Sequence, residues 1–218
     1  MIDKQKVSDY LNHMHKPFKR KECFTAILIN CFLSLPAILG EDNIFYWLIF
    51  ILALNTIFAI AYILLATKFF KKDKAPFYKI TLDCLSIFLL CVLGSYRIFD
   101  YGYDVPWYLP IIYFTAIIIV FIMSVLITRN LIKNFSGDKK KVNIALIATI
   151  ASIGGACAYI LARFIIRALP HDIVPFVVSM AILLLALIFE FFGASYLYYL
   201  HLIKKYDIDK FSNSNHQE

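Results

Sequence analysis

The feature that most constrains the fold is a long apolar segment near the carboxyl end of the sequence. Residues 175–203 (PFVVSMAILLLALIFEFFGASYLYYLHLI) contain one acidic side chain, Glu190, near their middle. At about 1.5 Å of rise per residue, a helix of this length exceeds the ~30 Å hydrocarbon core of a lipid bilayer. We therefore expect these residues to form a transmembrane helix.

The composition of the whole chain indicates the same class of protein. Of the 218 residues, 61% are hydrophobic and 17% are charged, and the mean hydropathy is +0.72. These values lie outside the range of soluble globular proteins and indicate an integral membrane protein. The net charge of +7 comes from short basic clusters between apolar runs, not from a stripe on a soluble domain, so we expect no nucleic-acid partner.

Six apolar segments are long enough to cross a membrane. They predict an all-α, polytopic bundle of six transmembrane helices over residues 23–203, with a basic segment before it (1–22) and a polar tail after it (204–218). A signal peptide is the alternative for the first run, but the run is long for this and no small-residue cleavage site follows it. The expected spans are 23–39, 44–66, 80–97, 107–127, 143–167 and 174–203.

The basic residues predict the orientation of the bundle. Nineteen of the 22 Lys and Arg residues precede the first span, follow the last, or lie near the links after the second and fourth spans. Because cytoplasmic loops are enriched in Lys and Arg, both termini are predicted to be cytoplasmic, and the spans form three hairpins. Seventeen of the 22 are Lys, a composition typical of AT-rich bacterial genomes, so we expect the bacterial cytoplasmic membrane.

Residues 1–22 carry a helical pattern. The side chains of Val7, Leu11 and Met14 recur at helical spacing, with charged residues on the other faces. This pattern predicts a short amphipathic helix on the cytoplasmic leaflet, broken near Pro17. A solvated, frayed tail is the alternative.

Glu190 is the first candidate for function, because an ionisable side chain at membrane depth is costly unless it is neutralised, paired or hydrated. On an ideal helix it shares one face with Ala194, Leu197 and His201. One hypothesis is a proton- or substrate-binding site with Glu190 and His201 in a cavity open to the cytoplasm. The other is a protonated Glu190 that hydrogen-bonds to a neighbouring helix and stabilises the bundle.

Two other charged residues lie within the expected third span. Asp83 is expected to reach cytoplasmic water or Lys79 at i−4, and it is a further candidate for a transport role. Arg97 is expected at the outer end, where its side chain extends into water near Asp100 and Asp104.

The fifth expected span contains small residues at four-residue spacing. Such rows let two helix backbones approach closely inside lipid, either within the bundle or between protomers of a homo-oligomer. Deeper in the first two spans, Asn30 and Asn55 are expected to hydrogen-bond between helices. The small residues are Ala148, Ser152, Gly155 and Ala156.

The longest external link, residues 99–108, is rich in aromatic side chains and contains two carboxylates. Aromatic residues near a membrane surface usually form an interfacial belt. The alternative is a recognition patch for a membrane or extracellular protein, since Tyr and Trp are favoured at the centres of protein interfaces. The patch would comprise Asp100, Tyr101, Tyr103, Asp104, Trp107 and Tyr108.

No motif for hydrolase, protease, ATPase or phosphate-transfer chemistry is present, so we do not expect an enzyme. The five cysteines lie in apolar runs without metal-ligand spacing, and neither a metal nor another cofactor is expected. The first functional hypothesis is a small membrane protein that acts through protein contacts, such as a toxin-immunity protein or an accessory subunit of a secretion or export machine. The alternative is a solute or ion permease, or its membrane subunit, with Glu190 as the coupling group.

Overall fold

The computed structural model describes residues 3–15, 18–38, 44–67, 74–103, 106–135 and 173–208. All regular structure in these ranges is helical, and five helical stretches are long and apolar enough to cross a membrane. They correspond to five of the six expected spans, and the chain is a multi-pass membrane protein. The other expected span, 143–167, lies outside the described residues.

Several helices extend beyond the apolar runs from which they were predicted. The third expected span, 80–97, is the central part of α5, which runs from Ala75 to Gly102. The difference arises because hydropathy marks only the apolar part of a helix, whereas the helix continues through polar turns at both ends. The helices are α1 (Lys4–Met14), α2 (Lys21–Leu33), α3 (Leu35–Ile38), α4 (Ile44–Ala66), α5 (Ala75–Gly102), α6 (Leu109–Lys133) and α8 (Val174–Lys205).

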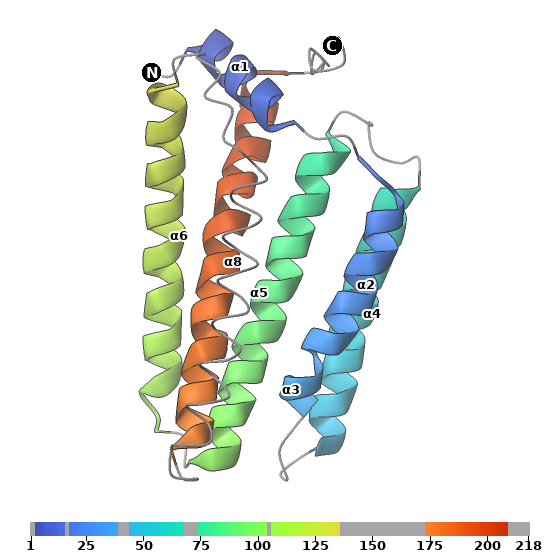
Figure 1. Cartoon of the computed structure of the whole chain (residues 1–218), viewed down its shortest axis with the longest axis vertical. Coiled ribbons are helices and arrows are strands. Elements are labelled where there is room, and N and C mark those ends of the chain that lie inside the picture. Colours follow the sequence, from blue (N-terminus) through green and yellow to red (C-terminus); the bar gives the residue numbers. More distant parts are fainter. Residues whose placement is uncertain are drawn as a thin grey trace, which may run out of the picture.

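Helices α5 and α8 form the antiparallel pair at the centre of the bundle (Figure 1). Helix α6 packs against α8, while α2, α3 and α4 pack against α5 on the other side. The two central helices approach closely at Gly193, where an added Cβ atom would lie 3.2 Å from Cβ of Cys84. Since lipid tails are as apolar as the helices, close backbone approach and interhelical hydrogen bonds hold such a pair together.

The first expected span is present, but it is interrupted. Helix α2 ends at Leu33, and the short α3 begins after Ser34, whose hydroxyl donates to the carbonyl of Cys31 at 2.7 Å. Pro36 lacks the N–H group that would continue the α2 hydrogen-bond ladder. Its ring packs on α5 at Gly94, where an added Cβ would be 3.2 Å from Cβ of Pro36. The expected span 23–39 is therefore present as two helical segments, and the break between them was not predicted.

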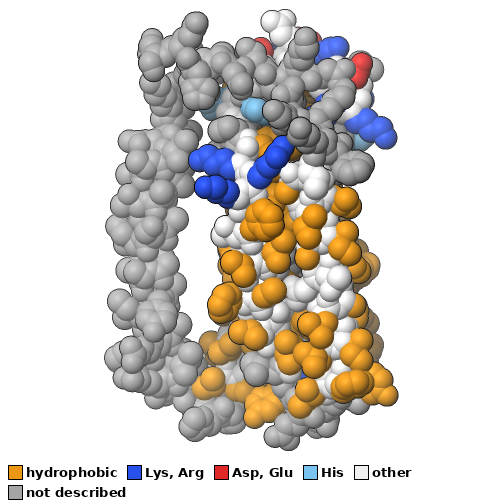
Figure 2. All heavy atoms as spheres, turned by 90° about the vertical axis from the view of Figure 1, so that its right-hand side faces the viewer, with side chains coloured by type: hydrophobic (Ala, Val, Ile, Leu, Met, Phe, Trp, Pro, Cys, Tyr) orange, Lys and Arg blue, Asp and Glu red, His pale blue; other side chains and the backbone are white. Residues whose placement is uncertain are grey.

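One end of the bundle carries α1, the starts of α2 and α5, and the ends of α4, α6 and α8. We call it the basic end, because among the described residues every Lys and Arg except Arg97 lies there. Figure 2 shows hydrophobic side chains over the lower part of the described surface, while Lys, Arg and His gather toward the upper, basic end. Large apolar side chains are exposed along the spans, which is consistent with contact with lipid.

Helix α1 lies across the basic end (Figure 1). Its apolar side chains Val7 and Leu11 are buried against Ile132 of α6 and Leu202 of α8. A helix with a buried apolar face is therefore present at Lys4–Met14, as the amphipathic pattern predicted, while its place on the cytoplasmic leaflet stays a prediction. Its apolar face is covered by the bundle and not by lipid, because the ends of α6 and α8 leave an apolar surface of their own.

Candidate functional site

Glu190 lies at the middle of α8 on the side that faces the bundle. Its side chain is 7% exposed, and among the described residues its Oε2 atom has no hydrogen-bond partner. Ala186 and Gly193, on the same face of α8, are buried as well. The arrangement places a carboxyl group inside an apolar bundle, where its ionised form is costly unless a partner or water reaches it.

The structure separates His201 from Glu190. Both residues are on one face of α8 by helical spacing, but Leu197 and His201 are exposed. Glu190 and His201 are eleven residues apart, which corresponds to about 16 Å along the helix. Because packed helices cross at an angle, the covered face of α8 changes along its length. The structure therefore does not bring the two side chains together, and a proton- or substrate-binding role for either of them stays a prediction.

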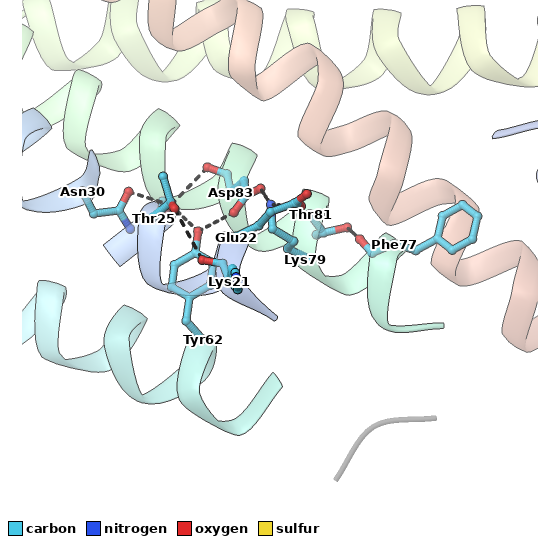
Figure 3. A network of polar contacts seen from close by, with 10 residues as sticks. Lys21, Glu22, Thr25, Asn30, Tyr62, Phe77, Lys79, Thr81 and Asp83 are labelled. Carbon is cyan, nitrogen blue, oxygen red and sulfur yellow. Dashed lines mark hydrogen bonds and ion pairs between the residues drawn. The ribbon is translucent and has the colours of Figure 1, made fainter. Parts of the chain in front are cut away.

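Asp83 is the centre of a second polar site, shown in Figure 3. Its Oδ2 atom is 2.6 Å from Nζ of Lys79, one turn earlier on α5, so the expected contact between these two residues is confirmed. Its Oδ1 atom accepts a hydrogen bond of 2.8 Å from the hydroxyl of Tyr62 on α4. The Tyr62 contact was not predicted, because Tyr62 and Asp83 are distant in sequence and no local pattern pairs them.

This site extends toward the interior of the bundle through further side chains. The Tyr62 hydroxyl is 3.2 Å from Oγ of Ser86, and Ser86 donates to Oδ1 of Asn30 on α2 at 3.1 Å. The Asn30 contact confirms the expected interhelical role, whereas Asn55 donates to the Ile51 carbonyl of its own helix. Glu22 of α2 is 3.5 Å from Lys79 at the opposite end of the series. We call this the Asp83 network: Glu22, Asn30, Tyr62, Lys79, Asp83 and Ser86.

The Asp83 network joins α2, α4 and α5 in one set of contacts. Tyr62, Ser86 and Asn30 are buried, whereas Glu22 is half exposed. Asn30, Asp83 and Ser86 were visible in the sequence as isolated polar residues in apolar spans, which is the signal that could have found them. Among the described residues the buried Nδ2 atom of Asn30 has no hydrogen-bond partner, whereas the other contacts link α2, α4 and α5. Interhelical hydrogen bonds of this kind stabilise a bundle in lipid, so the geometry favours a role in helix association over a role in transport.

Two clusters of hydroxyl groups, which we call the hydroxyl clusters, link α8 to its neighbours α5 and α6. Oγ of Ser95 is 2.8 Å from the hydroxyl of Tyr113 and 3.1 Å from Oγ of Ser179. Nearer the basic end, Oγ of Ser195 on α8 lies 2.9 Å from the hydroxyls of both Ser124 and Thr128 on α6. Sequence reasoning did not identify these residues, because a serine in an apolar helix often bonds only to its own backbone.

Arg97 is buried at the opposite end of the bundle. Its side chain is 2% exposed, its Nη1 atom is 2.7 Å from Oδ2 of Asp100, and its guanidinium lies 4.9 Å from the ring centre of Trp47. The expectation that Arg97 extends into water is therefore wrong. The Trp47 ring and Asp100 together cover it, a combination that the planar guanidinium favours. Asp104, the other expected neighbour, lies outside the described residues.

The expected outer recognition patch divides into exposed and packed residues. Trp107 is 81% exposed, Tyr101 64% and Tyr108 49%. Tyr103 instead packs on Phe99, with ring centres 5.2 Å apart. Asp100 pairs with Arg97, as described above. The exposed part, which we call the aromatic patch, is therefore Tyr101, Trp107 and Tyr108.

The small-residue row Ala148, Ser152, Gly155 and Ala156 lies outside the described residues. Within the part of the chain that the structure describes, no group of three His, Cys, Asp or Glu side chains is placed to hold a metal ion.

The chain matches no protein-family model, and no curated protein or solved structure is significantly similar to it.

Proposed function

We propose that this chain is a non-enzymatic membrane protein that acts by binding another protein at the bacterial cytoplasmic membrane. Roles of this kind include immunity against a membrane-active toxin and service as an accessory subunit of a secretion or export machine. The observation that carries the proposal is the exposure of the aromatic patch at the end opposite the basic end. With both termini in the cytoplasm, as the charge pattern predicts, this end faces outward.

The aromatic patch lies next to a cluster of buried hydrophobic side chains. Next to it, Phe99, Leu109 and Tyr113 form a buried cluster with Leu183 of α8. The three exposed rings therefore project from the ends of helices whose neighbouring turns are held in place. Rigid aromatic side chains lose little conformational entropy on binding, and this favours them at the centres of protein interfaces.

The interior supports a structural role for most buried polar groups. The Asp83 network and the two hydroxyl clusters use their hydrogen bonds between helices. A protein that acts by surface contacts needs a stable bundle of this kind, but it needs no polar path through it.

A matched pair of variants tests the proposal. The first replaces Tyr101, Trp107 and Tyr108 with Ala. The second replaces Phe45 and Tyr46 with Ala, two exposed aromatics at the start of α4 and at the same end of the bundle. The first partner to test is the product of the gene adjacent to the one that encodes this chain, assayed by complex formation in membranes. A recognition patch predicts that only the first variant loses the complex.

Equal behaviour of the two variants, with the complex intact in both, would contradict the proposal and leave the aromatic patch as part of an interfacial belt. Membrane insertion of each variant is checked by carbonate extraction and by its elution in detergent. A variant that fails either check is replaced by the single change Trp107→Ala, compared with Phe45→Ala.

A proton-coupled permease is the second candidate, and one observation favours it. The buried Oε2 atom of Glu190 has no hydrogen-bond partner among the described residues. At this oxygen the carboxyl group could take up or release a proton without breaking a hydrogen bond. Glu190→Gln retains the shape and removes the exchangeable charge, so the permease hypothesis predicts loss of proton-coupled uptake in proteoliposomes with the fold retained. A Gln variant with unchanged uptake would remove Glu190 from the mechanism.

A further inference from the structure

A cavity of about 360 Å³ lies at the basic end, between the first turn of α5 and the last turns of α8. Small-molecule sites commonly have volumes of about 300–1,000 Å³. The described residues that line the cavity are Lys74, Tyr78, Leu200, His201, Ile203, Lys204 and Asp207. None of them belongs to the Asp83 network or to the aromatic patch.

The polar lining is suited to an anion that carries a hydrogen-bond donor. Lys74 and Lys204 supply two ammonium groups, and His201 and Tyr78 supply two further side chains that can donate. Asp207 supplies one carboxylate, so the charged residues of the described lining, Lys74, Lys204 and Asp207, carry one net positive charge. A phosphate group fits the donors, while the carboxylate favours a ligand with a hydroxyl or ammonium group beside its phosphate.

The wall formed by Asp207 is held in position by the end of α8. Asp207 has a φ of 48°, the left-handed conformation that commonly follows the last turn of a helix. The Ile208 amide donates to the Ile203 carbonyl at 3.1 Å, which closes this turn, and Ile208 is buried in the cluster beneath α1. On this side the cavity is therefore bounded by a packed turn.

The position of the cavity indicates the source of the phosphate. It lies at the basic end, where Lys74 and Lys204 stand next to the apolar residues Leu200 and Ile203. Two of its lining residues, Leu200 and Ile203, are apolar and belong to the same turn of α8 as His201. A ligand with a charged headgroup above an apolar chain would match this boundary, and basic pockets between membrane helices bind such headgroups.

We propose that this cavity binds the phosphate of an anionic phospholipid headgroup that also carries a hydroxyl, with Lys74 and Lys204 on the phosphate and Asp207 on the hydroxyl. His201, which sequence analysis placed with Glu190, belongs to this site. The site is independent of the protein-contact function proposed above, because it lies at the other end of the bundle and shares no residue with the aromatic patch.

Lys204 and its neighbour offer a matched test. Lys204 lines the cavity, whereas Lys205 lies over the Tyr206 ring, with Nζ 5.7 Å from the ring centre, and is not among the lining residues. Lys204→Gln and Lys205→Gln remove the same charge from adjacent positions. If the cavity is a site, only the first change weakens binding substantially. If lipid is held by diffuse surface charge, the two changes have equal effects.

The experiment uses the whole protein, purified in neutral detergent, and measures binding of phosphatidylglycerol by native mass spectrometry and by the rise in thermal denaturation midpoint. Lys204→Gln is expected to weaken binding at least about tenfold, because a charge-assisted hydrogen bond is lost, and Lys205→Gln less than about twofold. Phosphatidic acid, which keeps the phosphate but lacks the glycerol hydroxyls, is expected to gain relative to phosphatidylglycerol in Asp207→Asn.

Competition by inorganic phosphate and binding of phosphatidylcholine show whether the cavity binds free phosphate or the phosphate of a lipid headgroup. Displacement of phosphatidylglycerol by millimolar phosphate would support the phosphate site and show that no lipid chain is needed. Failure of phosphate to compete, with phosphatidylglycerol still bound through Lys204, would support the lipid source. Equal binding of phosphatidylcholine, equal effects of the two Lys variants, or no binding of phosphatidylglycerol would each overturn the proposal. Elution in detergent shows that each variant is folded.

Discussion

The hydroxyl of Tyr62 on α4 donates a hydrogen bond of 2.8 Å to Asp83 on α5, and this contact ties α4 to the centre of the bundle. The same carboxylate pairs with Lys79 at 2.6 Å. One acidic side chain is thereby held between a neutral donor from another helix and a cation from its own. The arrangement explains how an ionisable residue is accommodated one or two turns inside a span.

Removing the Tyr62 hydroxyl is expected to destabilise the bundle. Tyr62→Phe deletes the bond to Asp83 and the contact with Ser86, and leaves those polar groups with fewer partners. Asp83 keeps its contact with Lys79 and Ser86 keeps its bond to Asn30, so the expected loss is that of an ordinary hydrogen bond, about 0.5–1.5 kcal/mol. The free energy of unfolding in mixed SDS–detergent micelles measures the effect. Tyr46→Phe is the control, because Tyr46 is 73% exposed on the same helix; similar losses in the two variants would contradict this role for Tyr62.

The contact between Gly193 and Cys84 is expected to limit the size of the side chain at position 193. Gly193→Leu forces α5 and α8 apart, because even a Cβ atom would lie 3.2 Å from Cβ of Cys84. Overpacking typically costs about 1–3 kcal/mol. Adding Cys84→Gly to the Leu variant should recover part of the loss in the same unfolding assay. A Leu variant as stable as the parent would show that the two helices do not pack at this point.

Helix α1 is expected to detach when its apolar face is charged. Val7→Asp together with Leu11→Asp places two carboxylates against Leu202 and its neighbours, where burial of each aliphatic side chain contributes about 1.5–3 kcal/mol. Limited proteolysis of the detergent-solubilised protein should then cleave within residues 4–14. Lys6→Asp, on the exposed face of α1, is the control and should leave the cleavage pattern unchanged. Protection of α1 in the double variant would argue against its docking on the bundle.

The basic end is expected to face the cytoplasm. In a variant without native cysteines, Cys at position 46 should react with a membrane-impermeant maleimide added outside intact cells, because this residue is at the opposite end. Cys at position 205 should react only after the cells are permeabilised. The reverse pattern would contradict the orientation inferred from Lys and Arg placement.

Much of the fold could be predicted because each transmembrane helix satisfies its own backbone hydrogen bonds, which makes its existence a local property of an apolar run. The segment around Glu190 is an example: its length and apolarity predicted α8 directly. The break at Ser34 was missed because Pro36 is close enough to the end of its run to be mistaken for a terminal residue. The contact between Asp83 and Lys79 could be predicted, since both residues lie on one helix at i, i+4 spacing.

The candidate sites were less predictable. His201 and Glu190 share a helical face by spacing, yet one is exposed at the basic end and the other is buried. Arg97 was expected in water, but Trp47 from another helix covers it. In each case the outcome depends on a neighbour that is remote in sequence, and periodicity along one helix carries no information about that neighbour.

By itself, the sequence determined that this chain is an all-helical, multi-pass membrane protein and where five of its spans lie, because these properties depend on hydropathy within single segments. For the amino-terminal segment it left two alternatives open, an amphipathic helix and a frayed tail. Only the tertiary structure decided which polar residues meet, such as Tyr62 with Asp83 and Ser95 with Ser179, and which of them line the cavity at the basic end. The physical reason is that helix order and crossing are set by the packing of side chains from distant segments, and this packing determines which face of each helix is covered.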